Sequence, residues 1–440
     1  MCKFRPDRVR SIQQREGPMS VQDFDVVVVG ASLAGCTSAI LLAREGLKVA
    51  VVERHAQADA HKALCTHFIQ ASALPVMRRL GIDKLIEEAG GVRGNLEIHS
   101  PAGWISCQLH RQQDPDLHHG YSIRRKRLDP MMRQLAADTP GVTMLLGSSA
   151  KNLVQSGDRI TGVELGGSQG KGTLTARLVV AADGRLSSMA TLAGVKAKSS
   201  PNLRFGVLAP MRNVDLQRGR LAQMWYTGTE VAYVFPNDDG VTLVAWMGLK
   251  EQFDSIQGRS LEALTERVRA MPEAPQLRQA ELAGDLLVVK DYPNLWRPAV
   301  VRGMALVGDA RMSLDYLQGV GCGWAMQSGA WLCDAVAADL KAGQDLGAGL
   351  ERYRRQVATL NGHRFTINDF SRTRSLRTMQ RLLFAASSKD IGLATQMSRL
   401  GARIDTPVHM LAPHVLLKAF WVHMTRREPL PRGPAPSFKQ

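Results

Sequence analysis

The sequence predicts an α/β fold (α+β overall), in which a parallel-sheet domain is interrupted by a smaller antiparallel-sheet domain and followed by a helical region. Three patterns support this prediction: a strand–turn–helix–strand unit near the N-terminus, short alternating apolar and polar runs between residues 205 and 293, and amphipathic patterns after Gly347. The chain has 440 residues, of which 45% are hydrophobic and 22% charged, so it can bury a large core in more than one folding unit.

The N-terminal unit is DFDVVVVGASLAGCTSAILLAREGLKVAVVER, residues 23–54. It predicts a buried strand over 26–29, a glycine turn, a helix over about 34–45 and a second strand over 48–52 that ends in Glu53. This length and order are those of a Rossmann-like βαβ unit that binds a dinucleotide.

The residues of the turn have the properties that such a site needs. Gly30 permits the tight turn, Gly35 lets the helix pack close to the strand, and Ser32 is small enough for a pyrophosphate to approach the helix N-terminus. Glu53 follows Gly35 by 18 residues and is placed to accept hydrogen bonds from a ribose. A βαβ unit with a purely structural role is the alternative. The dinucleotide-binding residues expected here are Gly30, Ser32, Ala34, Gly35, Glu53 and Arg54.

Two further segments combine an aspartate with glycines next to an apolar run. LTARLVVAADGRLSSMATLAG predicts a strand over 178–182, then Asp183 in an Asp-Gly pair and a helix that opens at Ser187. GDARMSLDYLQGVGCGWAMQ, residues 308–327, places glycines at alternate positions before a helix expected over about 323–340. Glycine at these positions costs backbone entropy on folding, so the backbone must need to be free of side chains there. The reason is a tight turn, a helix packed closely on a strand, or a ligand that lies against the main chain.

A fourth segment, YSIRRKRLDPMMRQLA, carries four consecutive basic residues before a helix. Leu128, Met132 and Leu135 form one apolar face of that helix, and we expect residues 124–127 to be its solvated start. Among the four basic residues, Arg125 is the one for which a functional role is expected.

In this order and spacing the four segments resemble FAD-dependent monooxygenases of the aromatic-hydroxylase type (group A, single-component flavoproteins), which are related to geranylgeranyl-reductase-like proteins and flavin halogenases. The resemblance runs from Gly30 to about Ala335 and implies an FAD-binding Rossmann-like domain with FAD as cofactor and NADH or NADPH as reductant. The chain departs from the usual pattern at Met312, Tyr316 and Gly323, where the family usually has His, Pro and often Asn.

The resemblance also implies a role for each motif residue. Arg125 would contact the cofactor, Asp183 would lie near both flavin and nicotinamide pyrophosphate, and Asp309 would hold the ribitol chain. Residues 319–321 would lie along the flavin ring, and the following helix would aim its N-terminal amides at the flavin N1 and C2 carbonyl. The residues that this adds to the FAD site are Arg125, Asp183, Gly308, Asp309, Gly319, Val320 and Gly321.

The reaction that the resemblance implies is insertion of one oxygen atom from O₂ into an aromatic or natural-product-like substrate through a flavin C4a-hydroperoxide. No acid–base residue is identified by spacing. A reductase or dehydrogenase of the geranylgeranyl-reductase-like type is the first competing function, because such proteins have a YxxFP-like strand similar to residues 233–236. A flavin halogenase is less favoured, since no WxWxIP stretch is found, and a non-catalytic flavin-binding module is the last candidate.

The alternating runs predict an antiparallel sheet that lines the substrate pocket, with PNDDGV as the turn of a hairpin. The substrate contacts to consider are Trp225, Tyr233, Phe235 and Trp246, and sheet core is the alternative for each of them. In HKALCTHF, Lys62 or His67 would meet the flavin or the nicotinamide cofactor.

The expected domain division follows these motifs. The basic helices after Gly347 would cap the flavin domain, with subunit pairing or an acidic partner as alternatives. The predicted segments are a disordered leader (1–22), an FAD-binding domain (23–75, 120–200 and 285–345), a substrate domain (76–119 and 201–284) and a helical region with a disordered tail (346–440).

Charge and cysteine content restrict the partners. The net charge is +16, and residues 364–440 alone contribute +9, which indicates either a solubilising surface or attraction of an anion: a dinucleotide phosphate, an acidic carrier protein or a membrane surface. The expected substrate is a small organic molecule, anionic or carrier-tethered. No nucleic-acid recognition motif, metal-ligand spacing, signal peptide or apolar run of membrane-spanning length is found. The six cysteines are scattered without a CxxC pair, which predicts reduced thiols in a cytoplasmic monomer or homodimer.

Overall fold

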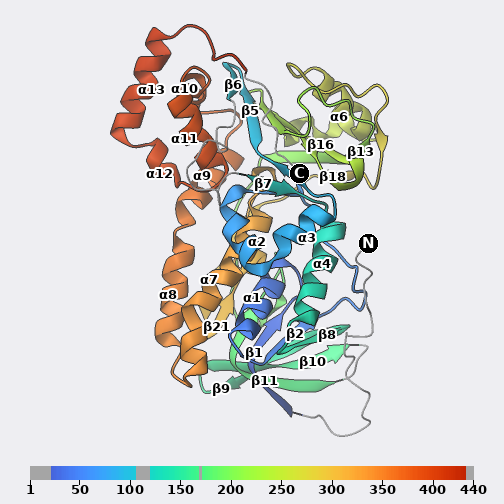
Figure 1. Ribbon diagram of the computed structural model, residues 1–440, viewed down its shortest axis with the longest axis vertical. Helices are drawn as coiled ribbons and strands as arrows, with labels where there is room; N and C mark the ends of the chain where they lie inside the picture. Colours follow the sequence, from blue (N-terminus) through green and yellow to red (C-terminus); the bar gives the residue numbers. More distant parts are fainter. Residues whose placement is uncertain (1–20, 106–118, 168–170, 433–440) are drawn as a thin grey trace.

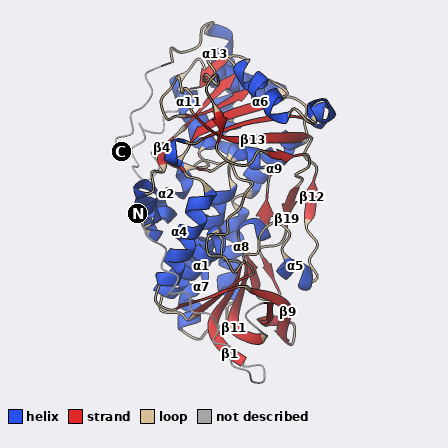
Figure 2. Cartoon of the chain, turned by 90° about the vertical axis from the view of Figure 1, so that its right-hand side faces the viewer, coloured by secondary structure: helices blue, strands red, loops and turns tan. Residues whose placement is uncertain are grey.

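The computed structural model describes residues 21–105, 119–167 and 171–432. The molecule is elongated, with a parallel-sheet domain at one end and an antiparallel sheet at the other (Figures 1 and 2). The last helices of the chain, within residues 378–425, lie beside the antiparallel sheet (Figure 1). The predicted α/β class is therefore confirmed. The predicted tail after residue 432 lies outside the described residues.

The parallel sheet is built around β1 (Val21–Val29), which pairs in parallel with β2 (Val49–Glu53) on one side and β11 (Gly172–Ala181) on the other. Its strand order is β20-β21-β11-β1-β2-β8, with Val26 and Val28 facing one core and Val27 and Val29 the other. The outer strands are β8 (Val142–Leu146), β20 (Val300–Val301) and β21 (Met304–Leu306).

Helices cover one face of this sheet and an antiparallel extension covers the other. Helices α1 (Leu33–Arg44), α4 (Arg125–Asp138) and α7 (Gly321–Lys341) pack into the first core. Strand β10 (Arg159–Gly167) pairs with β11, and β9 (Ser148–Ser156) pairs with β10. Ile160 and Val163 of β10 are buried in the second core. The short helix on that side is α5 (Ser188–Leu192).

The second sheet has the strand order β17-β13-β16-β15-β14-β5-β6, with β18 paired to β13. The predicted hairpin turn is confirmed, because β15 and β16 pair in antiparallel register on either side of residues 237–241. Helix α6 (Ser260–Arg269) packs with the core on one face. The strands are β5 (Leu96–Ser100), β6 (Gly103–Ile105), β13 (Arg204–Arg212), β14 (Ala222–Tyr226), β15 (Val231–Pro236), β16 (Thr242–Leu249), β17 (Glu281–Leu282) and β18 (Leu287–Val289).

Two small sheets connect the domains, in the orders β3-β7-β4 and β12-β19-β22. Figure 2 shows β12 and β19 along one side of the molecule, between the two large sheets. The strands are β3 (Phe68–Ile69), β4 (Val92–Gly94), β7 (Gly120–Ser122), β12 (Lys198–Ser200), β19 (Asn294–Trp296) and β22 (Met312–Ser313).

The C-terminal helices were expected to cap the parallel-sheet domain, and only some of them do. Helix α8 packs against α7, but α10 and α13 pack together in a separate core that includes Ile105 of β6. The apolar residues of α10 and α13 pack against the edge of the second sheet and not against the parallel-sheet domain. The helices are α8 (Gly347–Ala358), α9 (Asn361–Ser371), α10 (Thr378–Ser387), α11 (Ile391–Gly401), α12 (Pro407–Met410) and α13 (Pro413–Thr425).

Three segments pack differently from the expected domain division, whose boundaries stay a prediction. Strand β1 begins at Val21, inside the expected leader. Helices α2 (Leu74–Leu80) and α3 (Ile82–Glu88) bury apolar residues in the first core with α1 and α7, although the substrate domain was expected to begin at residue 76. Strand β18, which was expected in the FAD-binding domain (285–345), belongs to the second sheet, because its backbone pairs in antiparallel register with β13.

Arg124 was expected in a solvated helix start, and the structure buries it instead. Its guanidinium donates to Asp238 Oδ2 through Nε (3.0 Å) and Nη2 (2.6 Å), while Asp238 Oδ1 accepts from the Arg124 amide. Asp238 lies in the β15–β16 turn and is fully buried. The hairpin turn thus brings its carboxylate to the start of α4 and joins the two domains.

Replacing Asp238 with Ala leaves the buried Arg124 charge without its main partner. We expect Asp238→Ala to lower the free energy of unfolding by about 3–5 kcal/mol, measured by urea denaturation. Asp239→Ala is the matched control, because that side chain is 48% exposed and solvent screens its ion pairs, so its loss should cost much less. Equal effects of the two variants would contradict the argument.

Burial of His363 in α9 predicts a specific loss of stability in acid. Burial, and to a smaller extent Arg403, lower the pKa of His363 from 6.5 to about 3. Below pH 6.5, His363 therefore binds a proton in the unfolded chain but stays neutral in the folded chain. The free energy of unfolding consequently falls as the pH falls toward 3. Between about pH 6.5 and pH 5, His363→Phe should remove about 2 kcal/mol of this loss in urea denaturation.

Candidate functional site

A cavity of about 1120 Å³ lies at the carboxyl ends of the parallel strands and extends toward the second sheet. The turn after β1 and the segment before α7 both line it, so the two glycine-rich motifs are brought together as the sequence predicted. Ligands of open α/β sheets bind at this edge. The predicted residues that line the cavity are Gly30, Ser32, Ala34, Glu53, Arg54, Arg125, Asp183, Gly308, Asp309, Gly319, Val320 and Gly321.

The turn between β1 and α1 needs glycine for reasons of packing. Gly30 has φ +108°, and a Cβ atom there would lie 2.4 Å from the Ala182 carbonyl oxygen. A Cβ atom at Gly35 would lie 1.8 Å from the Gly30 carbonyl oxygen. Gly35 does not line the cavity, and its role is to let α1 pack close to the turn.

The start of α7 leaves space that no side chain of the described residues fills. A Cβ atom at Gly321, which lines the cavity, would meet no atom within 4 Å. The N-cap residues of α7 and α1, Val320 and Ser32, make no side-chain capping bond, and neither first turn contains an acidic residue. Two helix N-termini therefore present amide groups and positive partial charge at the same cavity.

Glu53 ends β2 as a buried carboxylate beside the α1 turn. Its Oε2 accepts from the Ala31 amide at 2.8 Å and its Oε1 from the His55 amide at 2.9 Å. Each carboxylate oxygen can accept a second hydrogen bond, so capacity for a ribose hydroxyl remains. Arg54, which follows it, is exposed at the rim of the same cavity.

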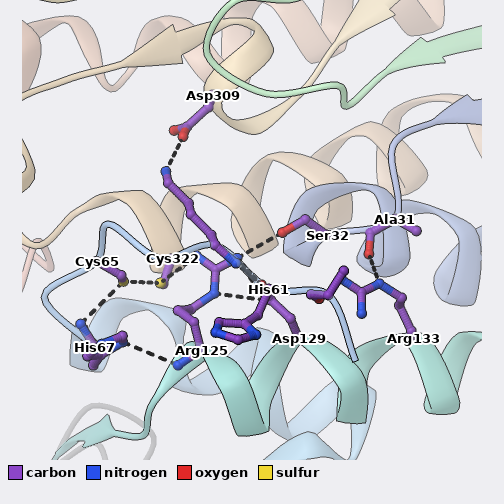
Figure 3. A network of polar contacts seen from close by, with 12 residues as sticks. Ala31, Ser32, His61, Cys65, His67, Arg125, Asp129, Arg133, Asp309 and Cys322 are labelled. Atoms are coloured by element: carbon purple, nitrogen blue, oxygen red, sulfur yellow. Dashed lines mark hydrogen bonds and ion pairs between the residues drawn. The ribbon is translucent and has the colours of Figure 1, made fainter. Parts of the chain in front are cut away.

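Arg125 organises the middle of the site, as Figure 3 shows. Its guanidinium donates to Asp129 through Nε (2.7 Å) and to Ser32 Oγ through Nη2 (2.8 Å). Asp129 also accepts from the backbone amide of Lys62 at 3.0 Å. The arginine predicted from the sequence therefore fastens α4 to the α1 turn and, through Asp129, to the segment that precedes β3.

Lys62 spans the cavity to the second motif. Its Nζ lies 2.7 Å from Asp309 Oδ2, and the negative charge of Asp309 raises the pKa of Lys62 (Figure 3). His67 has φ +59° and accepts a hydrogen bond from the Arg125 amide through Nδ1. The structure thus places Lys62 in the cavity wall, as expected, whereas His67 supports the start of α4 and is absent from the lining.

Two thiols that the sequence analysis did not combine lie in the same wall. Cys65 Sγ is 3.5 Å from Cys322 Sγ, and Cys322 Sγ is 3.7 Å from Arg125 Nη1 (Figure 3). The hydrogen bond with Cys322, together with His67 and Arg125, lowers the pKa of Cys65. The two residues are 257 positions apart, so no local spacing rule brings them together.

Asp183 has a capping role in addition to its place in the cavity wall. Its carboxylate accepts from Ser187 Oγ at 2.7 Å and from the Met189 amide at 2.9 Å, at the start of α5. The following Arg185 lies 3.9 Å above the ring of Tyr292. This end of the cavity is therefore held by polar contacts and is basic.

The four aromatic residues expected at the substrate side divide by strand face. Trp225 and Trp246 point to the core under α6 and do not reach the cavity. Tyr233 and Phe235 point to the opposite face, where Phe235 contacts Phe68 with ring centroids 5.4 Å apart. Phe68 lines the cavity, but Tyr233 and Phe235 lie one layer behind it and are buried. The alternative of sheet core describes all four residues.

The aromatic side chains that reach the cavity near the second sheet include Phe68, Tyr292 and Tyr316. Tyr316 fits there because Gly206 of β13 has no side chain: a Cβ atom at that glycine would lie 2.1 Å from the Tyr316 hydroxyl oxygen. The signal for Tyr316 was its position between Asp309 and Gly319, where the resembled family usually has Pro. Tyr292 carries no comparable signal.

The residues around this cavity fit a dinucleotide cofactor with an extended shape. The fit rests on a backbone cradle without side chains at Gly321, on the remaining acceptor capacity of Glu53 and on two uncapped helix N-termini. The fold and site define a nucleotide-binding protein of the Rossmann type.

The chain belongs to the family described as FAD binding domain, whose model matches residues 23–361. This membership supports FAD as the cofactor and makes the protein an FAD-dependent enzyme of the oxidoreductase class. The predicted family resemblance is confirmed.

Curated relatives include reductases and a hydroxylase. The chain is 31% identical over 199 residues to the probable electron transfer flavoprotein-quinone oxidoreductase YdiS of Escherichia coli, a match that covers 42% of each protein. It is 27% identical to digeranylgeranylglycerophospholipid reductase 1 of Methanopyrus kandleri, over 72% of this chain and 80% of that protein. It is 25% identical to the ubiquinone hydroxylase UbiM of Neisseria meningitidis, over 79% of this chain and 76% of that protein.

Solved structures confirm the fold. The flavin-dependent brominase Bmp2 matches with a TM-score of 0.73 and 18% identity, over 92% of this chain and all of that chain. PqsL, a probable FAD-dependent monooxygenase from Pseudomonas aeruginosa, matches with a TM-score of 0.65 and 16% identity, over 87% of this chain and all of that chain. At these identities the likeness concerns the fold alone.

The empty space beside Gly321 allows a test of the cofactor cradle. Gly321→Leu should leave the stability of the FAD-free protein within about 0.5 kcal/mol, because no described protein atom outside the helix's own backbone lies within 4 Å of a Cβ atom placed there. It should raise the dissociation constant of FAD about 10-fold or more, measured by quenching of flavin fluorescence.

Gly401→Leu is the matched control for that variant. Its Cβ position is also open, but Gly401 ends α11 and does not line the cavity. FAD affinity that is unchanged in Gly321→Leu would contradict the assignment of the cradle.

Proposed function

We propose that this protein is a monooxygenase that takes electrons from NADH or NADPH and inserts one atom of O₂ into a small organic substrate. The observation that carries the proposal is the continuity of the cavity. One space extends from the dinucleotide-type turn at Gly30 to the aromatic residues Phe68, Tyr292 and Tyr316 near the second sheet. A substrate bound there would lie next to the start of α7.

Residues of this chain would bind and orient FAD along that space. Glu53 would accept from a ribose hydroxyl, the first turn of α1 would bind the pyrophosphate, and Asp309 would accept from the ribityl chain. The Asp309 Oδ2 atom accepts a hydrogen bond from the Lys62 ammonium, which would orient the Asp309 carboxylate toward the cavity. Bound FAD supplies hydride acceptance and oxygen activation.

The substrate end of the cavity would exclude water. Phe68, Met312 and Leu314 are buried residues of its lining, and exclusion of water prevents unproductive loss of reducing equivalents as hydrogen peroxide. Burial raises the pKa of Tyr316 well above its ordinary value, so its hydroxyl keeps its proton where it packs against Gly206. Arg185 and Arg311, which also line the cavity, favour an anionic substrate.

A reductase that transfers hydride to an alkene is the second candidate. It is favoured by the match over 80% of the digeranylgeranylglycerophospholipid reductase and by the strand with Tyr233 and Phe235, similar to a YxxFP element. The two candidates differ in their need for oxygen.

Oxygen consumption separates the two functions. We expect the FAD-loaded protein to oxidise NADH or NADPH with oxygen uptake that equals formation of an oxygenated product when a panel of anionic aromatic and isoprenoid quinone-like compounds is supplied. The measurement combines an oxygen electrode with mass spectrometry of products under isotopically labelled oxygen gas. Turnover that continues without oxygen and yields a product with two additional hydrogens would contradict the monooxygenase function and support the reductase function.

A further inference from the structure

Helix α13 exposes a row of large apolar side chains at the outer edge of the molecule (Figure 1). Leu417, Phe420, Trp421 and Met424 are 71%, 57%, 57% and 67% exposed. Their spacing of three, four and seven residues places them on one face of the helix. Contiguous exposed apolar side chains of this size mark an interaction surface.

The same helix is already packed on its other side. Val415, Ala419 and Val422 are buried in the core shared with α10 and α11. Helix α13 therefore has two apolar faces. One is buried in the protein core, and the other is exposed to solvent. Val408, at 67% exposed, and Leu411, at 50%, extend the surface toward α12. The six exposed residues are called the α13 patch: Val408, Leu411, Leu417, Phe420, Trp421 and Met424.

The chain segment that carries the α13 patch has a net positive charge. Residues 378–428 contain seven Lys or Arg against three Asp or Glu. Lys418 and Arg426 both contact Asp390, at 2.8 and 3.2 Å, which offsets one of the three acids. The Arg426 guanidinium also lies 6.0 Å from the ring of Trp421, at the border of the apolar surface.

This combination decides between the candidate occupants. A second copy of the chain, docked symmetrically through the patch, would place two basic rims against each other. An anionic bilayer instead offers negative headgroups to the rim and acyl chains to the aromatic and aliphatic side chains. No helix in the described part of the chain is long and apolar enough to cross a membrane, so the contact would be with the membrane surface.

We propose that the α13 patch inserts into the headgroup–acyl boundary of an anionic lipid bilayer and holds the enzyme at the membrane surface. Trp421 and Phe420 supply the buried aromatic area, and the flanking Lys418, Arg426 and Arg427 interact with anionic headgroups. The contact involves no redox chemistry and is independent of the reaction proposed above.

Vesicle flotation of the full-length, FAD-loaded protein tests this proposal. We expect binding to phosphatidylcholine vesicles that contain about 30% phosphatidylglycerol, and at least about 10-fold weaker binding to phosphatidylcholine alone. Raising the salt from about 0.1 M to 1 M should weaken binding, because the Debye length falls from about 10 to 3 Å. The double variant Phe420→Ser/Trp421→Ser should bind at least about 10-fold more weakly.

A matched pair of single variants controls for loss of an exposed leucine in general. Leu417→Ser should weaken binding, whereas Leu282→Ser, in β17 at the far edge of the second sheet, should not. Flavin absorbance and the unfolding midpoint of each variant should equal those of the parent, since all of these side chains are exposed.

Several results would overturn the proposal. These are no binding of the parent protein to anionic vesicles, equal binding to neutral vesicles, or equal binding of the double variant. A dimer in sedimentation analysis that the double variant dissociates, without vesicle binding, would assign the patch to a second copy instead.

Discussion

The meeting of two helix N-termini at the carboxyl edge of one parallel sheet is the constraint on which the site depends. Helix α1 can start there only because Gly30 and Gly35 remove side chains from a space where a Cβ atom would lie 2.4 Å or less from a carbonyl oxygen. Helix α7 comes from a distant part of the chain and begins at the same place, with Gly321 open to the cavity. Amides that no side chain caps then face one space.

Ionic and polar contacts hold the surrounding segments to this edge. Arg125 and Asp129 connect α4 with the α1 turn and with Lys62, and Lys62 reaches Asp309 across the cavity. One residue before, Arg124 joins α4 to the hairpin of the second sheet through Asp238. Two adjacent arginines therefore serve different domains, and the start of a single helix contacts both the site and the hairpin of the second sheet.

The sequence predicted those parts of the site in which local chemistry determines the structure. The βαβ unit, the hairpin and the start of α7 follow from periodicity, turn residues and glycine spacing within short segments. Arg124 was assigned to solvent, because its partner Asp238 is 114 residues away and no local pattern joins them. The pair of Cys65 and Cys322 and the division of the aromatic residues between two strand faces depend in the same way on tertiary packing.

The contact between Gly206 and Tyr316 has a consequence for how the cavity can change. The phenol occupies the volume that a methyl group at position 206 would fill, so the strand and the ring share one small space. Any larger residue in the strand would have to displace the ring, and the ring is part of the cavity wall. The width of the cavity is thus controlled from a backbone position outside its lining, and a larger residue at position 206 would change that width without any change at Glu53, Arg125 or Asp309.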